Sequence, residues 1–239
     1  MTDPESINVC VKEIITKKIR IHTLVNNAGV SMVPNYMEAK TGVEMTCQTN
    51  YMGVVQLTEK LLPVLEYSIL INDVISRREE QPRCAFVTSL TYPKNPPSII
   101  DADHLFVNEL EYERFASYFR SKYLLTSFAL HLARTHPRVK TVICDPGVAA
   151  TNIARELGCI GKVYTWPIFQ WFVPPWKGAC TIAFAAASDC IDAMETGVLL
   201  RDCKKKELIE RIQDIEEQEK IYRVTSELLC RIEENGSVH

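Results

Sequence analysis

The sequence contains no long apolar run and no long basic run. No window approaches the 18 uninterrupted apolar residues of a membrane-spanning helix, and residues 1–6 lack the basic stretch and apolar core of a secretion signal. Lysine and arginine form no cluster longer than residues 204–206, and the formal net charge is −3. We therefore expect neither a bilayer-spanning chain nor a nucleic-acid partner.

Cysteine and glycine are present but never grouped. The nine cysteines include no Cys-x-x-Cys pair, and no histidine is spaced to complete a zinc site. We expect no metal and a set of reduced, buried or partly buried thiols, as in a cytoplasmic protein. The nine glycines nowhere form a cluster of three, so the sequence shows no glycine-rich loop for a phosphate group.

What is present predicts one ordinary domain of the α/β class. The chain has 239 residues, 46% apolar and 24% charged, which is enough for a sizeable core. The expected strands are 21–25, 84–89 and 140–144, and the expected helices begin at Asp3 and cover 40–65 and 111–134. Helices alternating with strands, without hairpin turns between them, predict parallel strands covered by helices on both faces.

Polar or turn-forming residues follow each of the three expected strands. Gly29, Ser89 and Gly147 come at or just beyond the strand ends. Because the carboxyl ends of parallel strands share one edge of a sheet, and ligands bind at that edge in α/β proteins, we expect these residues to border a ligand site.

The helix over 111–134 carries the segment Tyr118-Phe-Arg-Ser-Lys122. Side chains four residues apart on a helix share a face, and a lysine beside a tyrosine favours the phenolate. The pair would then lower the tyrosine pKa and make the phenol a general acid or base at a carbonyl or alcohol carbon. The alternative is a chance pattern on a solvated helix face.

Two segments near the C-terminus leave alternatives open. Residues 158–178 are rich in aromatic side chains interrupted by prolines, and they could form a lid over an apolar substrate, a membrane-surface contact or plain core packing. The lid residues would be Trp166, Phe169, Trp171 and Phe172. Residues 204–234 predict a charged amphipathic helical region, which we expect to dock on the surface rather than to form a short coiled coil.

Taken together, these motifs resemble the short-chain dehydrogenase/reductases, and in detail their retinol dehydrogenase-like branch. The motifs are Asn26-Asn-Ala-Gly29, Asn50, Ser89, Tyr118-x-x-x-Lys122 and Pro146-Gly147 leading to Thr151. The resemblance covers nearly the whole chain. It implies a Rossmann-like doubly wound parallel sheet, and a single partial Rossmann-type domain over residues 1–239.

The resemblance also implies roles for individual residues. Tyr118 would be the general acid/base, and Lys122 would lower its pKa and hold the nicotinamide ribose. Ser89 would bind the substrate oxygen, and Asn50 would relay a proton through water. The cofactor contacts would come from Tyr118 and Lys122, from Asn26 and Gly29 on the adenosine side, and from Pro146, Gly147, Val148 and Thr151 at the nicotinamide end and pyrophosphate.

The chain departs from the family pattern in two ways. It shows no opening strand and glycine-rich turn, so we expect an N-terminally truncated sheet in which the first two strands and most of the third are absent. The strand at 21–25 would then be an exposed apolar edge, covered by a second copy or another partner, or else a cause of lower stability. Asp145 precedes the Pro-Gly pair and would place a carboxylate near the nicotinamide.

The sequence is compatible with two different functions. The first is an oxidoreductase using NADP or NAD on a small apolar alcohol or carbonyl, such as a retinoid, a steroid or a lipid aldehyde. Such a protein would be cytoplasmic or peripheral to the endoplasmic reticulum membrane. The second is a catalytically silent, truncated relative or short isoform that acts as an interaction or regulatory protein.

Overall fold

The computed structural model describes residues 1–31, 33–75, 81–147 and 174–236 of the chain. Its helices are α1 (Pro4–Thr16), α2 (Met45–Cys47), α3 (Gly53–Ile75), α4 (Arg114–Thr135), α6 (Pro175–Ala187) and α7 (Ile215–Gly236). Its strands are β1 (Thr23–Asn26), β2 (Arg83–Val87), β3 (Lys140–Asp145), β4 (Val198–Arg201) and β5 (Lys204–Lys206).

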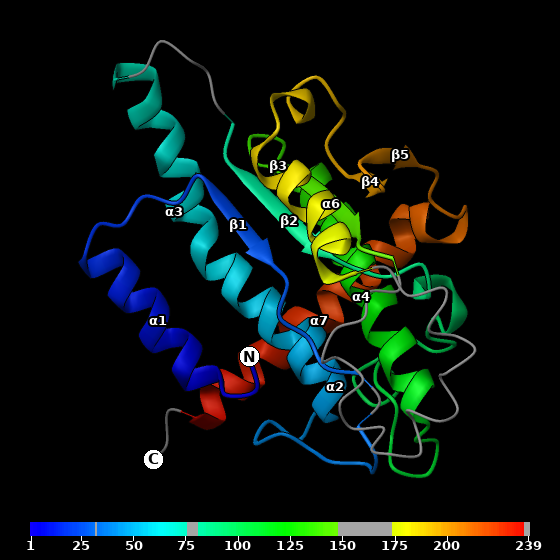
Figure 1. Cartoon of the computed structure of the whole chain (residues 1–239). Coiled ribbons are helices and arrows are strands. Elements are labelled where there is room, and N and C mark those ends of the chain that lie inside the picture. The colour runs from blue at the N-terminus through cyan, green and yellow to red at the C-terminus, as the bar shows by residue number, and fades with distance from the viewer. Residues whose placement is uncertain (32, 76–80, 148–173, 237–239) are drawn as a thin grey trace.

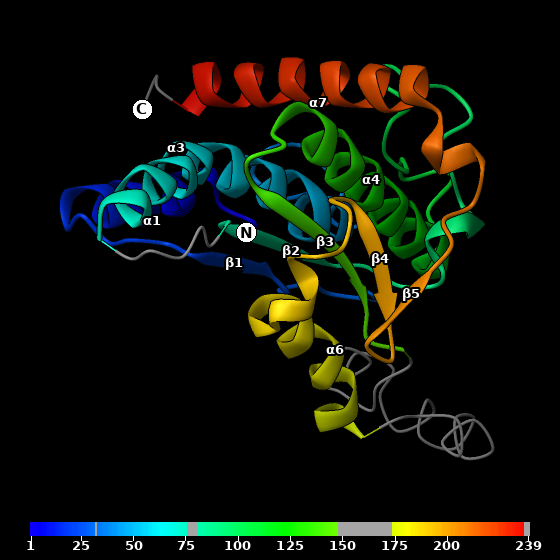
Figure 2. The same cartoon turned by 90° about the horizontal axis from the view of Figure 1, so that it is seen from above.

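The five strands form one sheet in the order β1-β2-β3-β4-β5. The first four are parallel, and β5 is antiparallel to β4. Helices α3 and α4 cover one face of the sheet, α7 packs on their outer side, and α6 covers the other face (Figures 1 and 2). The α/β class with helices on both faces is therefore confirmed.

Helix α1 begins where the sequence predicts. Asp3 is its N-cap, and the Asp3 carboxylate accepts a hydrogen bond from the Glu5 backbone N–H at 3.1 Å. Pro4 occupies the first turn, where its missing N–H costs nothing. Ile7 and Val11 are buried and pack against α3, so the predicted apolar face is the one that docks.

The helix observed in this region differs in two respects from the one expected over residues 40–65. It begins at Met45, passes through a π-helical turn at Gln48–Met52, and then continues as α3 to Ile75. Pro63 lies inside α3 and does not end it. The proline removes one backbone hydrogen bond, but Leu62 and Leu65 beside it are buried in the core, and tertiary packing outweighs the local preference.

The region 204–234 is not helical from its start. Asp202 and Cys203 have φ values of 51° and 56°, which make a tight two-residue turn into β5 at Lys204–Lys206. Two consecutive left-handed residues favour this kind of hairpin, and nothing in the exposed lysines signals a strand. The C-terminal helix α7 begins only at Ile215.

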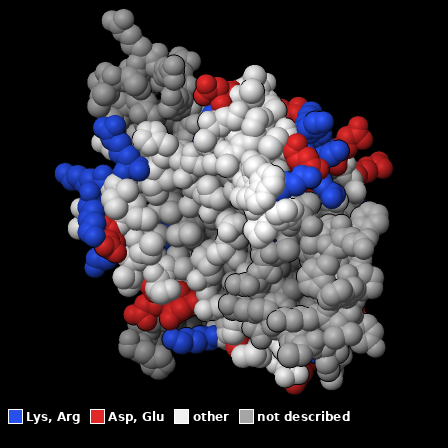
Figure 3. Space-filling view, in the orientation of Figure 1, with Lys and Arg blue, Asp and Glu red and all other residues white. Residues whose placement is uncertain are grey.

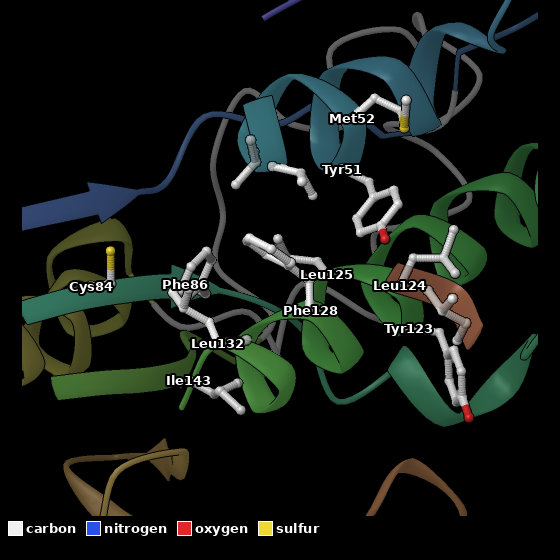
Figure 4. Close-up of a cluster of buried hydrophobic side chains, with 14 of the residues drawn as sticks. Tyr51, Met52, Cys84, Phe86, Tyr123, Leu124, Leu125, Phe128, Leu132 and Ile143 are labelled. Atoms are coloured by element: carbon white, nitrogen blue, oxygen red, sulfur yellow. The ribbon is translucent and has the colours of Figure 1, made fainter. Parts of the chain in front are cut away.

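The main core lies between the sheet and helices α3, α4 and α7. Phe86 of β2 meets Phe128 of α4 edge to face, with ring centroids 5.8 Å apart (Figure 4). Helix α7 closes this core through Ile221, Val224 and Leu229. A hydrogen bond of 2.7 Å joins the buried hydroxyls of Tyr51 and Thr225. Helix α7 is thus docked on its neighbours, as its amphipathic pattern predicts.

Strand β1 lies at the edge of the sheet. Within the described residues it pairs only with β2, and Val25 is 38% exposed. Figure 3 shows that the middle of the molecular face drawn there carries few charges, which gather toward its rim. An exposed edge is a common site of strand addition. The partner expected to cover it stays a prediction.

The described cysteines differ in exposure. Cys47, Cys84 and Cys144 are buried, Cys203 is half-buried, and Cys10, Cys180, Cys190 and Cys230 are exposed. The expectation that all would be buried or partly buried is therefore wrong, because the exposed ones lie in α1, α6, α7 and a short 3₁₀ turn at positions facing solvent. None of the cysteines in the described part of the chain forms a disulfide.

Candidate active site

The carboxyl ends of β2 and β3 form the floor of the site. Val87 pairs with Cys144 in register, and the Thr88 N–H donates to the Cys144 carbonyl at 2.8 Å, which carries the pairing one residue further. Ser89 follows directly. The Thr88 hydroxyl in turn contacts the Thr126 hydroxyl of α4 at 2.7 Å, so the strand end and α4 are fixed to each other.

Ser89 and Tyr118 come together at this edge. Tyr118 is partly buried, and the Ser89 hydroxyl forms a hydrogen bond with its phenol. The Thr91 hydroxyl donates to the Ser89 oxygen at 2.9 Å, which leaves the Ser89 proton for the phenol or for a substrate oxygen. Ser89 and Tyr118, which are far apart in the sequence, thus place their hydroxyl groups side by side.

Burial raises the pKa of Tyr118, and repulsion from the Asp145 carboxylate raises it further, while the Ser89 hydrogen bond acts in the opposite direction. The expectation that the neighbouring lysine lowers this pKa is therefore wrong for the described arrangement. Desolvation of the phenolate is the largest cause of the rise, and it outweighs the Ser89 hydrogen bond. A phenol with a raised pKa keeps its proton at neutral pH.

Lys122 is 4% exposed, and its ammonium donates to the Val87 carbonyl at 2.8 Å. Its Nζ lies 5.7 Å from the centroid of the Tyr118 ring. Burial lowers the pKa of Lys122 to about 8. The spacing of four residues does bring the two side chains together, as the sequence predicts.

Asn50 is fully buried within the π-helical turn before α3. Its side-chain oxygen accepts from the Val30 N–H at 2.8 Å, and its amide group donates to the Val30 carbonyl at 2.8 Å and to the Ser121 hydroxyl at 3.0 Å. The Ser121 hydroxyl donates to the Tyr118 carbonyl at 2.7 Å. Asn50 is therefore fixed to both the loop after β1 and the tyrosine helix.

Sequence reasoning missed the two residues that hold Asn50. Val30 acts through its backbone, for which a sequence has no signal. Ser121 carries a weak signal, because a hydroxyl three residues after Tyr118 lies one helical turn along the same face. π-Helical turns inside helices are rare and often occur at functional positions.

Gly29 lies against both Asn50 and Lys122. A Cβ atom at this glycine would be 3.0 Å from the Asn50 side-chain oxygen and 3.7 Å from the Lys122 Nζ. The position therefore needs glycine for close approach rather than for turn formation. The structure gathers Gly29, Asn50 and Lys122 into one group, beside which Tyr118 and Ser89 lie.

Asn26 ends β1, and Gly147 follows β3 at the same edge of the sheet. The Asn26 amide donates to the Thr58 hydroxyl at 3.1 Å, and its buried side-chain oxygen has no hydrogen-bond donor. Gly147 has φ 72°, a value that disfavours other residues, and its N–H donates to the Asp145 carboxylate at 3.0 Å. Pro146 holds the turn between them. Gly29 contacts the site group directly, whereas the roles of Asn26 and Gly147 at the site stay predictions.

Part of the predicted site lies outside the described residues. This part consists of Val148, Thr151, Trp166, Phe169, Trp171 and Phe172. Trp176, in the first turn of α6, is 67% exposed. Among the described residues, no group of three histidine, cysteine, aspartate or glutamate side chains is placed to hold a metal ion. No described helix is both long enough and apolar enough to cross a membrane.

Comparison with known proteins agrees with this geometry. A family model described as short chain dehydrogenase matches residues 1–75. An uncharacterized oxidoreductase of Schizosaccharomyces pombe is 29% identical over 233 residues, covering 95% of this chain and 67% of that protein. Retinol dehydrogenase 14 of Homo sapiens is 26% identical over 225 residues, covering 92% of this chain and 62% of that protein. Residues 1–75 thus resemble the short-chain dehydrogenases, and most of the chain is similar to these two proteins.

The chain spans about two thirds of the length of those relatives, at 67% and 62%. The crystal structure of 3-ketoacyl-(acyl-carrier-protein) reductase from Brucella melitensis complexed with NADH matches it with a TM-score of 0.56 and 20% identity. The match covers 83% of this chain and 72% of that one. At this identity the likeness shows the fold, and it confirms the Rossmann-like sheet.

The buried ammonium of Lys122 predicts a specific pH dependence of stability. Below about pH 8 the folded chain bears the full cost of burying the charge, because Lys122 is protonated in both states. Between about pH 8 and 10.5 the folded lysine loses its proton while the unfolded one keeps it, so the cost is relieved. The free energy of unfolding of the wild type, minus that of Lys122→Met, should rise by about 2–3 kcal/mol from pH 7 to pH 10.5.

Urea denaturation at several pH values measures this difference. Lys12→Met, which changes an exposed lysine of α1, serves as the matched control and should show a flat difference. A Lys122→Met difference that stays flat or falls over the same pH range contradicts the prediction.

Proposed function

We propose that this chain carries the proton-transfer centre of a nicotinamide-dependent oxidoreductase that interconverts an apolar alcohol and its carbonyl compound. The observation that carries the proposal is the meeting of Tyr118, Ser89 and Lys122 at the carboxyl edge of the parallel sheet. Helix α4 supplies Tyr118 and Lys122, and the chain directly after β2 supplies Ser89. Hydrogen bonds hold Ser89 through Thr91 and Lys122 through the Val87 carbonyl. Such preorganisation is what proton transfer and charge stabilisation require.

The residues present fit a nicotinamide and its ribose. Gly29 lets the backbone after β1 lie close to Asn50 and to the Lys122 ammonium. An ammonium carries three N–H donors, and Lys122 directs one of them to the Val87 carbonyl. The remaining donors suit ribose hydroxyls. The unpaired, buried oxygen of Asn26 offers a further acceptor near the end of β1.

The chemistry follows from the state of the phenol. When bound, a reduced nicotinamide supplies a hydride, with its electron pair, to the carbonyl carbon of the substrate. Tyr118, which holds its proton at neutral pH, donates that proton to the carbonyl oxygen as the π bond opens. Ser89 donates a hydrogen bond to the same oxygen while charge develops there. Water then returns a proton to the phenolate.

The substrate class rests on similarity and on exposed apolar side chains. Retinol dehydrogenase 14, which aligns with 92% of this chain, is named for an apolar alcohol. Leu90 and Phe115, which flank Ser89 and Tyr118 in the sequence, are 46% and 49% exposed. We propose a retinoid or another lipid alcohol or aldehyde as substrate. Both NADPH and NADH belong in the assay, because the described residues contain no group that selects between them.

The test is binding and turnover by the purified chain. We expect NADPH or NADH to quench tryptophan fluorescence, and we expect oxidation of that cofactor to be observed at 340 nm with retinal or a medium-chain aldehyde. No quenching at high micromolar cofactor, together with no turnover on either kind of aldehyde, would refute the proposal. The matches to oxidoreductases favour this function over that of a catalytically silent interaction protein.

A further inference from the structure

Arg120 lies in the middle of the segment Tyr118–Lys122 of α4, and the proposed reaction gives it no role. It is half-buried. Within the described residues its guanidinium donates only to backbone carbonyl groups, from Nε to Asn95 at 3.0 Å and from Nη1 to Leu105 at 3.1 Å and His104 at 3.3 Å. Withdrawing a charge from water costs free energy, so these contacts need a reason.

The hydroxyl of Ser89 depends for its orientation on the turn that follows it. The Thr91 N–H and the Thr91 hydroxyl both donate to the Ser89 hydroxyl oxygen, at 3.3 and 2.9 Å. The Ser89 carbonyl accepts from the Tyr92 N–H at 3.0 Å. The Thr91 carbonyl accepts from the Lys94 N–H at 3.0 Å, which completes a 3₁₀ turn at Tyr92–Lys94. A movement of this turn therefore moves the hydroxyl that is to bind the substrate oxygen.

Asn95, the next residue, attaches this turn to α4 at two points. Its side-chain amide donates to the Ala116 carbonyl at 2.9 Å, and its own carbonyl accepts from the Arg120 Nε at 3.0 Å. Ala116 and Arg120 lie one helical turn apart, and Tyr118 lies midway between them in the sequence. The turn that orients Ser89 is thus fixed to the stretch of helix that carries Tyr118.

We propose that Arg120 is a positioning residue that holds the turn after Ser89 against α4 and so sets the Ser89 hydroxyl relative to the Tyr118 phenol. This inference rests on the proposed function. Leu105, whose carbonyl also accepts from the guanidinium, is fully buried in the main core, so Arg120 joins Asn95 to a fixed point. A planar guanidinium directs several N–H groups to separate acceptors at once, which a lysine ammonium does less well.

The decisive comparison is between Arg120→Met and Arg134→Met. Arg134 lies near the other end of α4 and donates to Gln218 of α7 at 2.6 Å, away from the turn after Ser89. Arg120→Met should lower kcat for carbonyl reduction by about 10- to 100-fold, because a small displacement of a group at the reacting oxygen has an effect of that size. Cofactor affinity, measured by fluorescence quenching, should not change. Arg134→Met should leave kcat unchanged.

A double-mutant cycle tests whether Arg120 acts through Ser89. Ser89→Ala removes the hydroxyl, after which its placement no longer matters. In that background Arg120→Met should lower kcat by less than about threefold, whereas a merely structural loss would have the same effect in both backgrounds. Arg120→Lys keeps the charge and should remain impaired, because an ammonium does not reproduce the separate bonds to the carbonyls. Equal effects in both backgrounds, or wild-type kcat in Arg120→Lys, overturn the inference.

Amide hydrogen exchange followed by NMR is a second readout that does not need turnover. The N–H groups of Tyr92 and Lys94 are hydrogen-bonded within the turn, so their exchange should be at least about tenfold faster in Arg120→Met and unchanged in Arg134→Met. If Arg120→Met does not fold, Arg120→Lys takes its place. Unchanged exchange in the folded variant overturns the inference. Faster exchange in a chain that never turns over refutes the proposed function and leaves the attachment of the turn by Arg120 standing.

Discussion

Replacing Tyr118 by phenylalanine should lower kcat/KM for carbonyl reduction by about 10²- to 10⁴-fold, because the phenol is the proton donor at the reacting oxygen. The loss should appear in kcat, since the substrate and the cofactor keep their other contacts. Steady-state kinetics with the better of the two nicotinamide cofactors measures it. The fold should be unaffected, because the phenol oxygen bonds to Ser89 at the surface of the site and not to the core.

Tyr67→Phe is the matched control for Tyr118→Phe. It removes the same atom from an exposed tyrosine of α3 and should leave both kinetic constants unchanged. Retention of more than a tenth of the wild-type rate in Tyr118→Phe, with activity intact in the control, would show that another group donates the proton. The pH profile of the residual activity should also lose the limb that the phenol causes.

Replacing Phe128 by alanine should lower the free energy of unfolding by about 3–5 kcal/mol. Phe128 is 2% exposed and links three layers, since its ring meets Phe86 of β2 edge to face and stacks on Tyr222 of α7 at 6.3 Å. Its loss leaves a cavity where the sheet, α4 and α7 meet. Chemical denaturation followed by circular dichroism measures the change.

Phe115→Ala provides the control on the same helix. Phe115 is 49% exposed, and its truncation should cost less than about 1 kcal/mol. Equal losses for the two variants would contradict the assignment of the main core to the layer between the sheet and α7. If the Phe128→Ala chain is expressed only in aggregated form, it can be refolded and treated with a protease. It should then be cleaved faster than Phe115→Ala, because proteolysis rates report the same order of stability.

Local signals were sufficient for some parts of the fold. Asp3 followed by Pro4 predicts the start of α1, because a capping carboxylate and a proline both suit the first turn and need no distant partner. The apolar segments ahead of Ser89 and Gly147 predict β2 and β3 for a similar reason. Where the outcome depended on distant packing, the prediction was wrong. Pro63 does not end α3, because the core holds the helix on both sides of it.

For the candidate site, the sequence alone predicted which residues lie together and which family the chain resembles. Tyr118 and Lys122 share a helix, so their spacing predicts that they meet, and Ser89 ends a strand at the edge where ligands bind. Only the tertiary structure decided their electrostatic state. The pKa of a group depends on burial and on charges brought from other elements, and a local pattern contains neither.

The direction of the Tyr118 shift shows this limit. The four-residue spacing predicts a lowered pKa, but burial and the carboxylate of Asp145, which arrives from β3, raise it. The Val30 backbone and the Ser121 hydroxyl, which form hydrogen bonds with Asn50, likewise lie 20 and 71 residues from it in the sequence. The sequence therefore determined which candidate groups the site contains, whereas the tertiary structure decided the direction in which their pKa values shift, because desolvation and charges from distant segments arise only on folding.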